Sequence, residues 1–82
     1  MENRIKKVMS AVFEIPNIEI SEASTMDTIE SWDSLKHMNL VIALEDEFQI
    51  TIPDEEVGNL LSFSLIKLIV GEIIGSDDWN NY

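Results

Sequence analysis

Hydrophobic residues in the first part of the chain recur at helical spacing. They follow the i, i+3, i+4, i+7, i+8 pattern of one buried stripe: Ile5, Val8, Met9, Val12 and Phe13. We predict that this helix ends ahead of Pro16, because proline disfavours helical geometry at the residue before it. No period persists from residue 15 to residue 33. We therefore predict a long connection, which leaves room for a short helical turn. It is anchored on the core by its apolar side chains: Ile18, Ile20, Met26, Ile29 and Trp32.

A second helix is predicted from Ser34 to about Phe48, with Asp33 as its N-cap. Its apolar positions form two stripes when successive residues are turned by about 100°. One stripe is typical of a core face and consists of Leu40, Val41, Leu44 and Phe48. The other adjoins the helix start and consists of Leu35, Met38 and Ile42, with Glu45 between the two stripes. This second stripe is either buried as well, if the helix is central, or a docking surface with an apolar centre and a charged rim.

The last part of the chain predicts two further helices. Pro53, followed by three acidic residues, favours a helix start, and Gly58 keeps that helix short. Ser62 is a suitable cap for the last helix, and Gly75 a suitable end. The last helix has a wide apolar face: Phe63, Ile66, Ile69, Val70, Ile73 and Ile74. Ile50 and Ile52 alternate with polar residues but lack a partner segment, so they are assigned to an extended loop.

These elements predict an all-α protein, a small four-helix bundle with a long first connection and a short third helix. Residues 1–75 would form the single domain that a chain of 82 residues allows. Residues 76–82 are polar, and we expect them to form a mobile tail. Trp79 and Tyr82 in this tail are expected to be exposed rather than to anchor a partner.

Charge narrows the choice of partners. Sixteen acidic residues against five basic ones give a net charge of −11. This balance disfavours binding to nucleic acid or anionic membranes and favours a partner protein with a basic surface. The chain has no cysteine, so disulfides and thiolate metal sites are excluded.

Membrane insertion is not expected. The apolar stretch over residues 57–74 contains Gly58, Asn59, Lys67 and Glu72, and its densely apolar half is too short to span a bilayer. The opening segment is amphipathic and does not have the pattern of a signal peptide. We therefore expect a cytoplasmic protein and, by default, a monomer.

Ser34 is the most informative residue, because it stands in the first turn of a predicted helix. A helix start presents unpaired backbone N–H groups and a partial positive charge, which favour an anion. A phosphate ester on this hydroxyl would be stabilised there. This position suggests an attachment site rather than a catalytic nucleophile.

Three segments together resemble the acyl carrier proteins. They are Asp33-Ser34-Leu35, Leu44-Glu45-Asp46-Glu47-Phe48 and Ile52-Pro53-Asp54-Glu55-Glu56, and the resemblance extends from about Arg4 to Ile74. It implies that a phosphopantetheinyl transferase esterifies Ser34 with 4′-phosphopantetheine, whose terminal thiol carries acyl groups as thioesters. It also implies that the protein is not an enzyme and that the second helix is recognised by basic patches on the transferase, an acyl-loading ligase and acyl-transferring enzymes. The residues expected to take part in recognition are Asp33, Leu35, Met38, Ile42, Glu45, Asp46 and Glu47.

The chain departs from the usual fatty-acid-synthesis carriers in two places. Ser31 stands two residues before Asp33, where those carriers usually have glycine, and Lys36 and Asn39 replace acidic residues at the start of the second helix. The acidic rim is therefore neutralised beside Ser34. We interpret this as a carrier dedicated to one pathway, such as that of a secondary metabolite, a surface polysaccharide or a modified lipid.

The same residues fit other classes of protein less well. His37 shares a helix face with Ser34, but a hydrolase also needs a group that orients the base and an oxyanion hole. The acidic clusters lack the spacing of a calcium loop, so no metal site is predicted. An acidic decoy of nucleic acid would leave Ser34 and its apolar stripe unexplained. An aminoacyl or peptidyl carrier is the second choice, because it shares the fold and the attachment chemistry.

Overall fold

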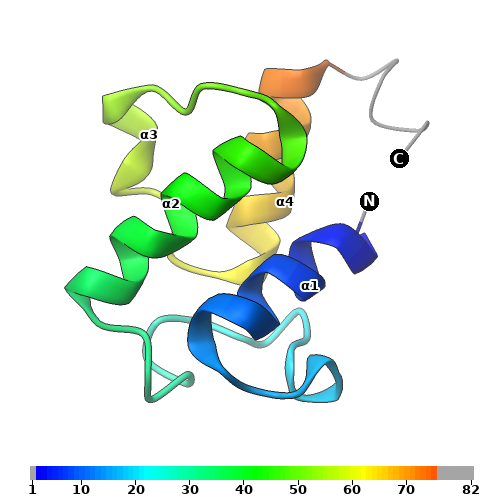
Figure 1. Cartoon of the computed structure of the whole chain (residues 1–82), viewed down its shortest axis with the longest axis vertical. Coiled ribbons are helices and arrows are strands. Elements are labelled where there is room, and N and C mark those ends of the chain that lie inside the picture. The colour runs from blue at the N-terminus through cyan, green and yellow to red at the C-terminus, as the bar shows by residue number, and fades with distance from the viewer. Residues whose placement is uncertain (1, 76–82) are drawn as a thin grey trace.

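The computed structural model describes residues 2–75, so the predicted tail at 76–82 lies outside the described residues. Within them the chain forms four α-helices and one short 3-10 helix (Figure 1). The elements are α1 (Glu2–Phe13), η1 (Asn17–Glu19), α2 (Ser34–Phe48), α3 (Asp54–Val57) and α4 (Phe63–Ile74). The described residues contain no strand, only an isolated antiparallel bridge between Thr25 and Ser62. The predicted four-helix architecture, with its short third helix, is confirmed.

The helix ends follow from the capping residues. Asp33 is extended and its carboxylate accepts a hydrogen bond from the Lys36 N–H at 2.8 Å, so it caps α2 as predicted. Ser62 caps α4 in the same way by accepting from the Leu65 N–H at 3.1 Å. Gly75 ends α4 with a φ of 99°, a conformation that favours glycine. Pro53 lies one residue before α3, where its missing N–H costs no helical hydrogen bond.

The core lies where α1, α2 and α4 meet. The first predicted stripe of α2 is buried, and α1 packs chiefly against this helix (Figure 1). At the end of α4, Ile73 and Ile74 are only half-buried, less than predicted. The most completely buried side chains come from all three long helices and from two loops: Ile5, Met9, Phe13, Ile20, Leu40, Leu44, Leu60, Phe63, Ile66 and Val70.

The long connection between α1 and α2 is held against the bundle and contains the helical turn that the sequence left open. Ile20, Ile29 and Trp32 are buried as predicted, and Met26 is half-buried. Ile18 contradicts the prediction: it is 91% exposed, because η1 turns it toward solvent.

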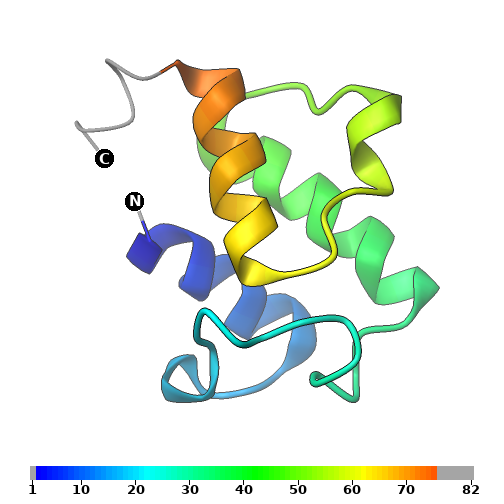
Figure 2. The ribbon, with the colours of Figure 1, turned by 180° about the vertical axis from the view of Figure 1, so that it is seen from behind.

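Backbone hydrogen bonds fix the middle of this connection to the start of α4. The Met26 N–H donates to the Leu61 carbonyl, and the Phe63 N–H donates to the Ser24 carbonyl, both at 3.0 Å. Figure 2 shows the connection passing beside the start of α4 before it reaches α2. The segment that leads to Ser34 is therefore an ordered part of the fold.

No helix in residues 2–75 is long and apolar enough to cross a membrane.

An exposed apolar stripe, which the sequence did not reveal, lies on α4 and the residue before its cap. It consists of Leu61, Leu65 and Leu68, whose side chains are 39–56% exposed.

Candidate attachment site

Ser34 is the first residue of α2, and its side chain is exposed. Its hydroxyl makes no hydrogen bond with any residue in the described range 2–75. The Asp33 cap leaves the other backbone N–H groups of the first turn without a helical acceptor. An accessible hydroxyl at the positive end of a long helix suits a phosphate ester.

The residues before Ser34 are fixed to the end of α1. Trp32 is buried, and its ring packs on Phe13 with the two ring centroids 4.7 Å apart. The Ser31 hydroxyl donates to the Phe13 carbonyl at 2.9 Å. Ser31, noted in the sequence as a departure, therefore fastens the loop through its side chain, which glycine could not do.

Both ring nitrogens of His37 form hydrogen bonds. Its Nδ1 accepts from the Trp32 Nε1–H at 3.0 Å, and its Nε2 lies 2.7 Å from the Val57 carbonyl oxygen at the end of α3. The indole N–H can only donate and the carbonyl can only accept, so the imidazole is neutral with its proton on Nε2. Neither nitrogen is available as a base for Ser34, which argues against a hydrolase. Neither can bind a phosphate without losing one of these bonds.

The second stripe of α2 is exposed. Leu35, Met38 and Ile42 are 70%, 50% and 61% exposed, so the alternative in which both stripes are buried is wrong. The stripe starts next to Ser34 and runs along α2. Exposed apolar side chains in such an arrangement mark an interaction surface more often than scattered ones do.

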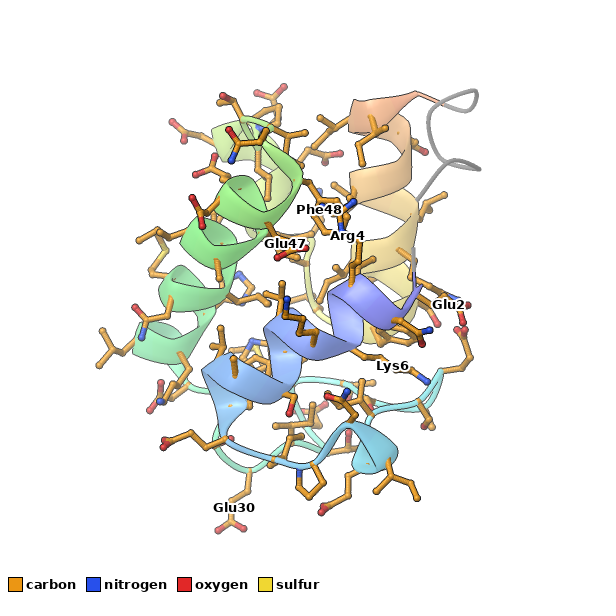
Figure 3. All side chains as sticks on the ribbon, turned by 45° about the vertical axis from the view of Figure 1, so that its right-hand side comes forward. Glu2, Arg4, Lys6, Glu30, Glu47 and Phe48 are labelled. Atoms are coloured by element: carbon orange, nitrogen blue, oxygen red, sulfur yellow. The ribbon has the colours of Figure 1, made fainter. Side chains whose placement is uncertain are left out.

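The three acidic residues near the end of α2 have different surroundings. Glu45 accepts a hydrogen bond from the Ile52 N–H at 2.8 Å, and Glu47 forms an ion pair with Arg4 at 2.9 Å. Both side chains are half-buried, whereas Asp46 is exposed. In Figure 3, Arg4 reaches across to Glu47 and Phe48, and its guanidinium lies 4.5 Å from the centroid of the Phe48 ring. Asp46 is therefore the most accessible of the three carboxylates.

Lys36 and Asn39 stand in the first two turns of α2, which contain no acidic residue. Lys36 is half-buried and forms an ion pair with Glu14 at 3.4 Å, while Asn39 is exposed. An open hollow of about 770 Å³ lies nearby, between the end of α1 and the long connection. Glu14, Glu19 and Glu30 are among its lining residues, so an anionic group would be repelled from it.

A cluster of charges lies away from Ser34, where the start of α1 meets α4. Lys67 pairs with Glu2 at 2.7 Å and also with Glu22, and the Ser64 hydroxyl donates to Glu22 at 2.6 Å. The hydrogen bonds from Lys67 and then Ser64 lower the pKa of Glu22. The hydrogen bonds to Glu2 and then Glu22 raise the pKa of Lys67.

No group of acidic and histidine side chains in residues 2–75 has the arrangement of a metal site. Within that range, then, the feature best suited to chemistry is an exposed serine at a helix start, flanked by an ordered loop and an apolar stripe. A site of this kind is chemically suited to holding a tethered anionic group.

Comparison with known proteins identifies the class. Residues 3–64 match the family model described as "phosphopantetheine attachment site". The fold is similar to that of the holo acyl carrier protein from Geobacter metallireducens, with a TM-score of 0.80 and 22% sequence identity. That match covers 99% of this chain and 92% of the other.

The chain therefore belongs to the phosphopantetheine-attachment family and has the acyl carrier protein fold. Its cofactor is a covalently attached 4′-phosphopantetheine. The family comprises carriers that are not themselves catalytic and that work with phosphopantetheinyl transferases and acyl-handling enzymes.

Proposed function

We propose that Ser34 is the residue that receives 4′-phosphopantetheine and that residues 1–75 form the carrier domain. The observation that supports this assignment is the exposed hydroxyl of Ser34, free of internal hydrogen bonds, at the first position of α2. Esterification there breaks no hydrogen bond among the described residues 2–75. It also places the phosphate where the helix dipole favours negative charge.

Attachment is a transfer from coenzyme A. The bond between Ser34 Oγ and phosphorus forms, the pyrophosphate P–O bond of coenzyme A breaks, the hydroxyl proton is lost, and adenosine 3′,5′-bisphosphate leaves. When bound, the group supplies a terminal thiol that holds an acyl group as a thioester. The protein itself orients the attachment point through the Asp33 cap and the packing of Trp32 on Phe13.

The exposed stripe of Leu35, Met38 and Ile42 is proposed to contact the transferase and the acyl-handling enzymes. An apolar centre beside the attachment point gives such enzymes a surface to desolvate. Asp46 is proposed as the main acidic contact for a basic patch, because it is exposed. Glu45 and Glu47 contribute to the same negative field, although their internal partners restrict how far their side chains can move.

We further propose that the carrier serves a dedicated pathway. Lys36 pairs with Glu14, and Asn39 is uncharged, so the surface beside Ser34 is less acidic than the far end of α2. Electrostatic complementarity selects partners mainly through association rate and rejection of the wrong surface. A partner matched to this chain would have its basic residues facing Asp46 rather than Lys36.

The attachment is tested by incubating the protein with coenzyme A and a broad-specificity phosphopantetheinyl transferase and measuring intact mass. We expect the gain of one phosphopantetheine group, absent in Ser34→Ala. Ser64→Ala is a matched control, because Ser64 also lies in the first turn of a helix but donates to Glu22. It should be loaded like the wild type. No mass gain with several transferases would overturn the assignment and favour the acidic decoy.

The cargo requires a second measurement. The group found on the arm after isolation from the producing cell separates an acyl carrier from an aminoacyl or peptidyl carrier. If fatty-synthesis enzymes load and elongate this protein as efficiently as they do a housekeeping carrier, the proposal of a dedicated pathway is contradicted.

A further inference from the structure

His37 joins two parts of the molecule that are distant in sequence. It accepts from the indole of Trp32, two residues before Ser34, and it donates to the carbonyl of Val57, the last residue of α3. We name these two hydrogen bonds the His37 bridge. The two hydrogen-bonded rings are nearly parallel, with ring centroids 6.2 Å apart and an interplanar angle of 21°. The bridge therefore connects the attachment loop to α3 through a side chain of α2.

α3 depends on such contacts. It has only four residues, and none of them is fully buried. Side chains from α2 hold both of its ends: Glu45 accepts from the Ile52 N–H before α3 begins, and His37 donates to Val57 where it finishes. An element with little buried apolar surface opens locally at low free-energy cost, so losing one of these bonds changes how long it stays in place.

We propose that His37 is a positioning residue. As a neutral imidazole with its proton on Nε2, it holds the Ser34 loop and α3 together. In this way it sets the rate at which phosphopantetheine is transferred to Ser34. The proposal rests on Ser34 being the attachment residue. An enzyme that binds the loop and α2 together with α3 recognises the locked arrangement. Its apparent affinity then falls with the fraction of molecules in that arrangement.

The geometry makes the bridge sensitive to protonation. A second proton on the imidazole must go to Nδ1, which faces the Trp32 N–H, and two donors cannot share a hydrogen bond. Acidification therefore opens the bridge on the loop side, while the Nε2–H bond to α3 can persist.

Other charged groups adjoin the bridge. Asp33 and Lys36 precede His37 in the chain, Glu14 at the end of α1 pairs with Lys36, and Glu56 adjoins the α3 end of the bridge. All of them are retained in a variant changed only at His37. A comparison between that variant and the wild type therefore isolates the imidazole.

The test measures the initial rate of phosphopantetheine transfer from coenzyme A to the full chain. His37→Phe keeps an aromatic ring and removes both hydrogen bonds, while His37→Gln keeps one acceptor and one donor. Trp32→Phe keeps a ring, removes the indole donor and should be loaded about fivefold more slowly, since one bond of the bridge is lost. We expect His37→Phe to be loaded between about fivefold and about thirtyfold more slowly, the factors that one and two neutral hydrogen bonds of ordinary strength represent. His37→Gln should stay within about twofold of the wild type.

The pH dependence of the loading rate distinguishes the positioning role of His37 from a merely structural one. The ratio of the wild-type rate to the His37→Gln rate should fall on acidification, because a proton on Nδ1 breaks the bond from Trp32 in the wild type, whereas the glutamine amide takes up no proton. The transferase's own pH dependence cancels in this ratio. The chain has one histidine, so the nitrogen NMR signals of the imidazole report the tautomer directly.

Each outcome has a defined meaning. The positioning role is overturned by equal loading of His37→Phe and wild type, or by no recovery of the rate in His37→Gln. It is also overturned by a ratio independent of pH, or by a proton on Nδ1 in place of Nε2. If His37→Phe does not fold, Trp32→Phe and the pH ratio still decide the question. A wild type that gains no arm overturns the proposed function as well, and this result differs from equal loading of all variants.

Discussion

The Glu45 carboxylate, near the end of α2, accepts a hydrogen bond from the backbone N–H of Ile52 at 2.8 Å. Ile52 is buried, and its N–H has no partner in a helix because it lies in the extended segment before α3. A side chain that the sequence indicates as a docking group therefore also supports the fold.

Glu45→Ala should consequently destabilise the protein by about 1–3 kcal/mol, the cost of leaving a buried donor unsatisfied. Urea unfolding followed by circular dichroism measures this free energy. Glu45→Gln retains an acceptor and should lose less. Asp46→Ala is the matched control, because Asp46 is the exposed neighbour, and it should change the stability by less than about 0.5 kcal/mol. Equal effects at the two positions would contradict the role of Glu45.

Arg4 should contribute more than an ordinary surface ion pair. Its guanidinium donates to the Glu47 carboxylate at 2.9 Å and to the Glu47 carbonyl at 2.7 Å, and it lies over the Phe48 ring. We expect Arg4→Ala to lower the unfolding free energy by about 1–2 kcal/mol, and Arg4→Lys to recover less than half of this, because lysine lacks the planar fork. A double-mutant cycle with Glu47→Ala in urea measures the coupling. Complete recovery in Arg4→Lys would show that only the charge matters.

The caps of α2 and α4 should contribute similar amounts to the free energy of unfolding. Asp33→Ala removes the acceptor of the Lys36 N–H, and Ser62→Ala removes the acceptor of the Leu65 N–H. Each change should cost about 1 kcal/mol, while Asp33→Asn should cost only a few tenths. Thermal unfolding compares the variants. An unchanged midpoint in Asp33→Ala would argue against the cap as the reason why α2 begins at Ser34.

The proposed docking stripe is tested by a pair of matched substitutions. Ile42 and Leu68 are similarly exposed, at 61% and 56%, but lie on α2 and α4 respectively. Ile42→Ser should slow phosphopantetheine transfer several-fold while leaving stability within about 0.5 kcal/mol of the wild type. Leu68→Ser should alter neither quantity. Equal transfer rates for the two variants would remove the α2 stripe from the proposed interface.

The ion-pair cluster around Lys67 predicts two pH limits. The pKa of Glu22 is lowered from its ordinary value of 4.5, so its stabilising effect is present above pH 4.5 and is lost as the pH falls through the lower folded-state value. The pKa of Lys67 is raised from 10.5, so its effect is present below pH 10.5 and is lost as the pH rises through the higher folded-state value.

Lys67→Met should remove the effect of Lys67 and the larger part of the effect at Glu22, to which the Ser64 hydroxyl still donates. The melting temperatures of variant and wild type should therefore approach each other well below pH 4.5 and again well above pH 10.5. Calorimetry across this range measures the difference. A constant difference at all pH values would assign the effect of the substitution to packing, since Lys67 also lies 5.1 Å from the centroid of the Phe63 ring.

The sequence by itself determined the helices and the position of Ser34. Asp33, Ser62 and Gly75 set helix ends through local hydrogen bonds and backbone conformation, so their effect is readable from adjacent residues. The two stripes of α2 were likewise separable, because helical periodicity is a local property. Which stripe would be exposed depended on the placement of the other helices.

Only the tertiary structure decided which polar groups bond to one another and which single apolar residues are buried or exposed. Glu45 bonds to Ile52, and His37 bridges the attachment loop and α3, through contacts that leave no periodic signal in the chain. Ile18 was predicted to be an anchor and is exposed, because η1 turns it outward. Such contacts depend on how distant segments approach one another, and hydrophobic pattern and local propensity contain no information about that approach.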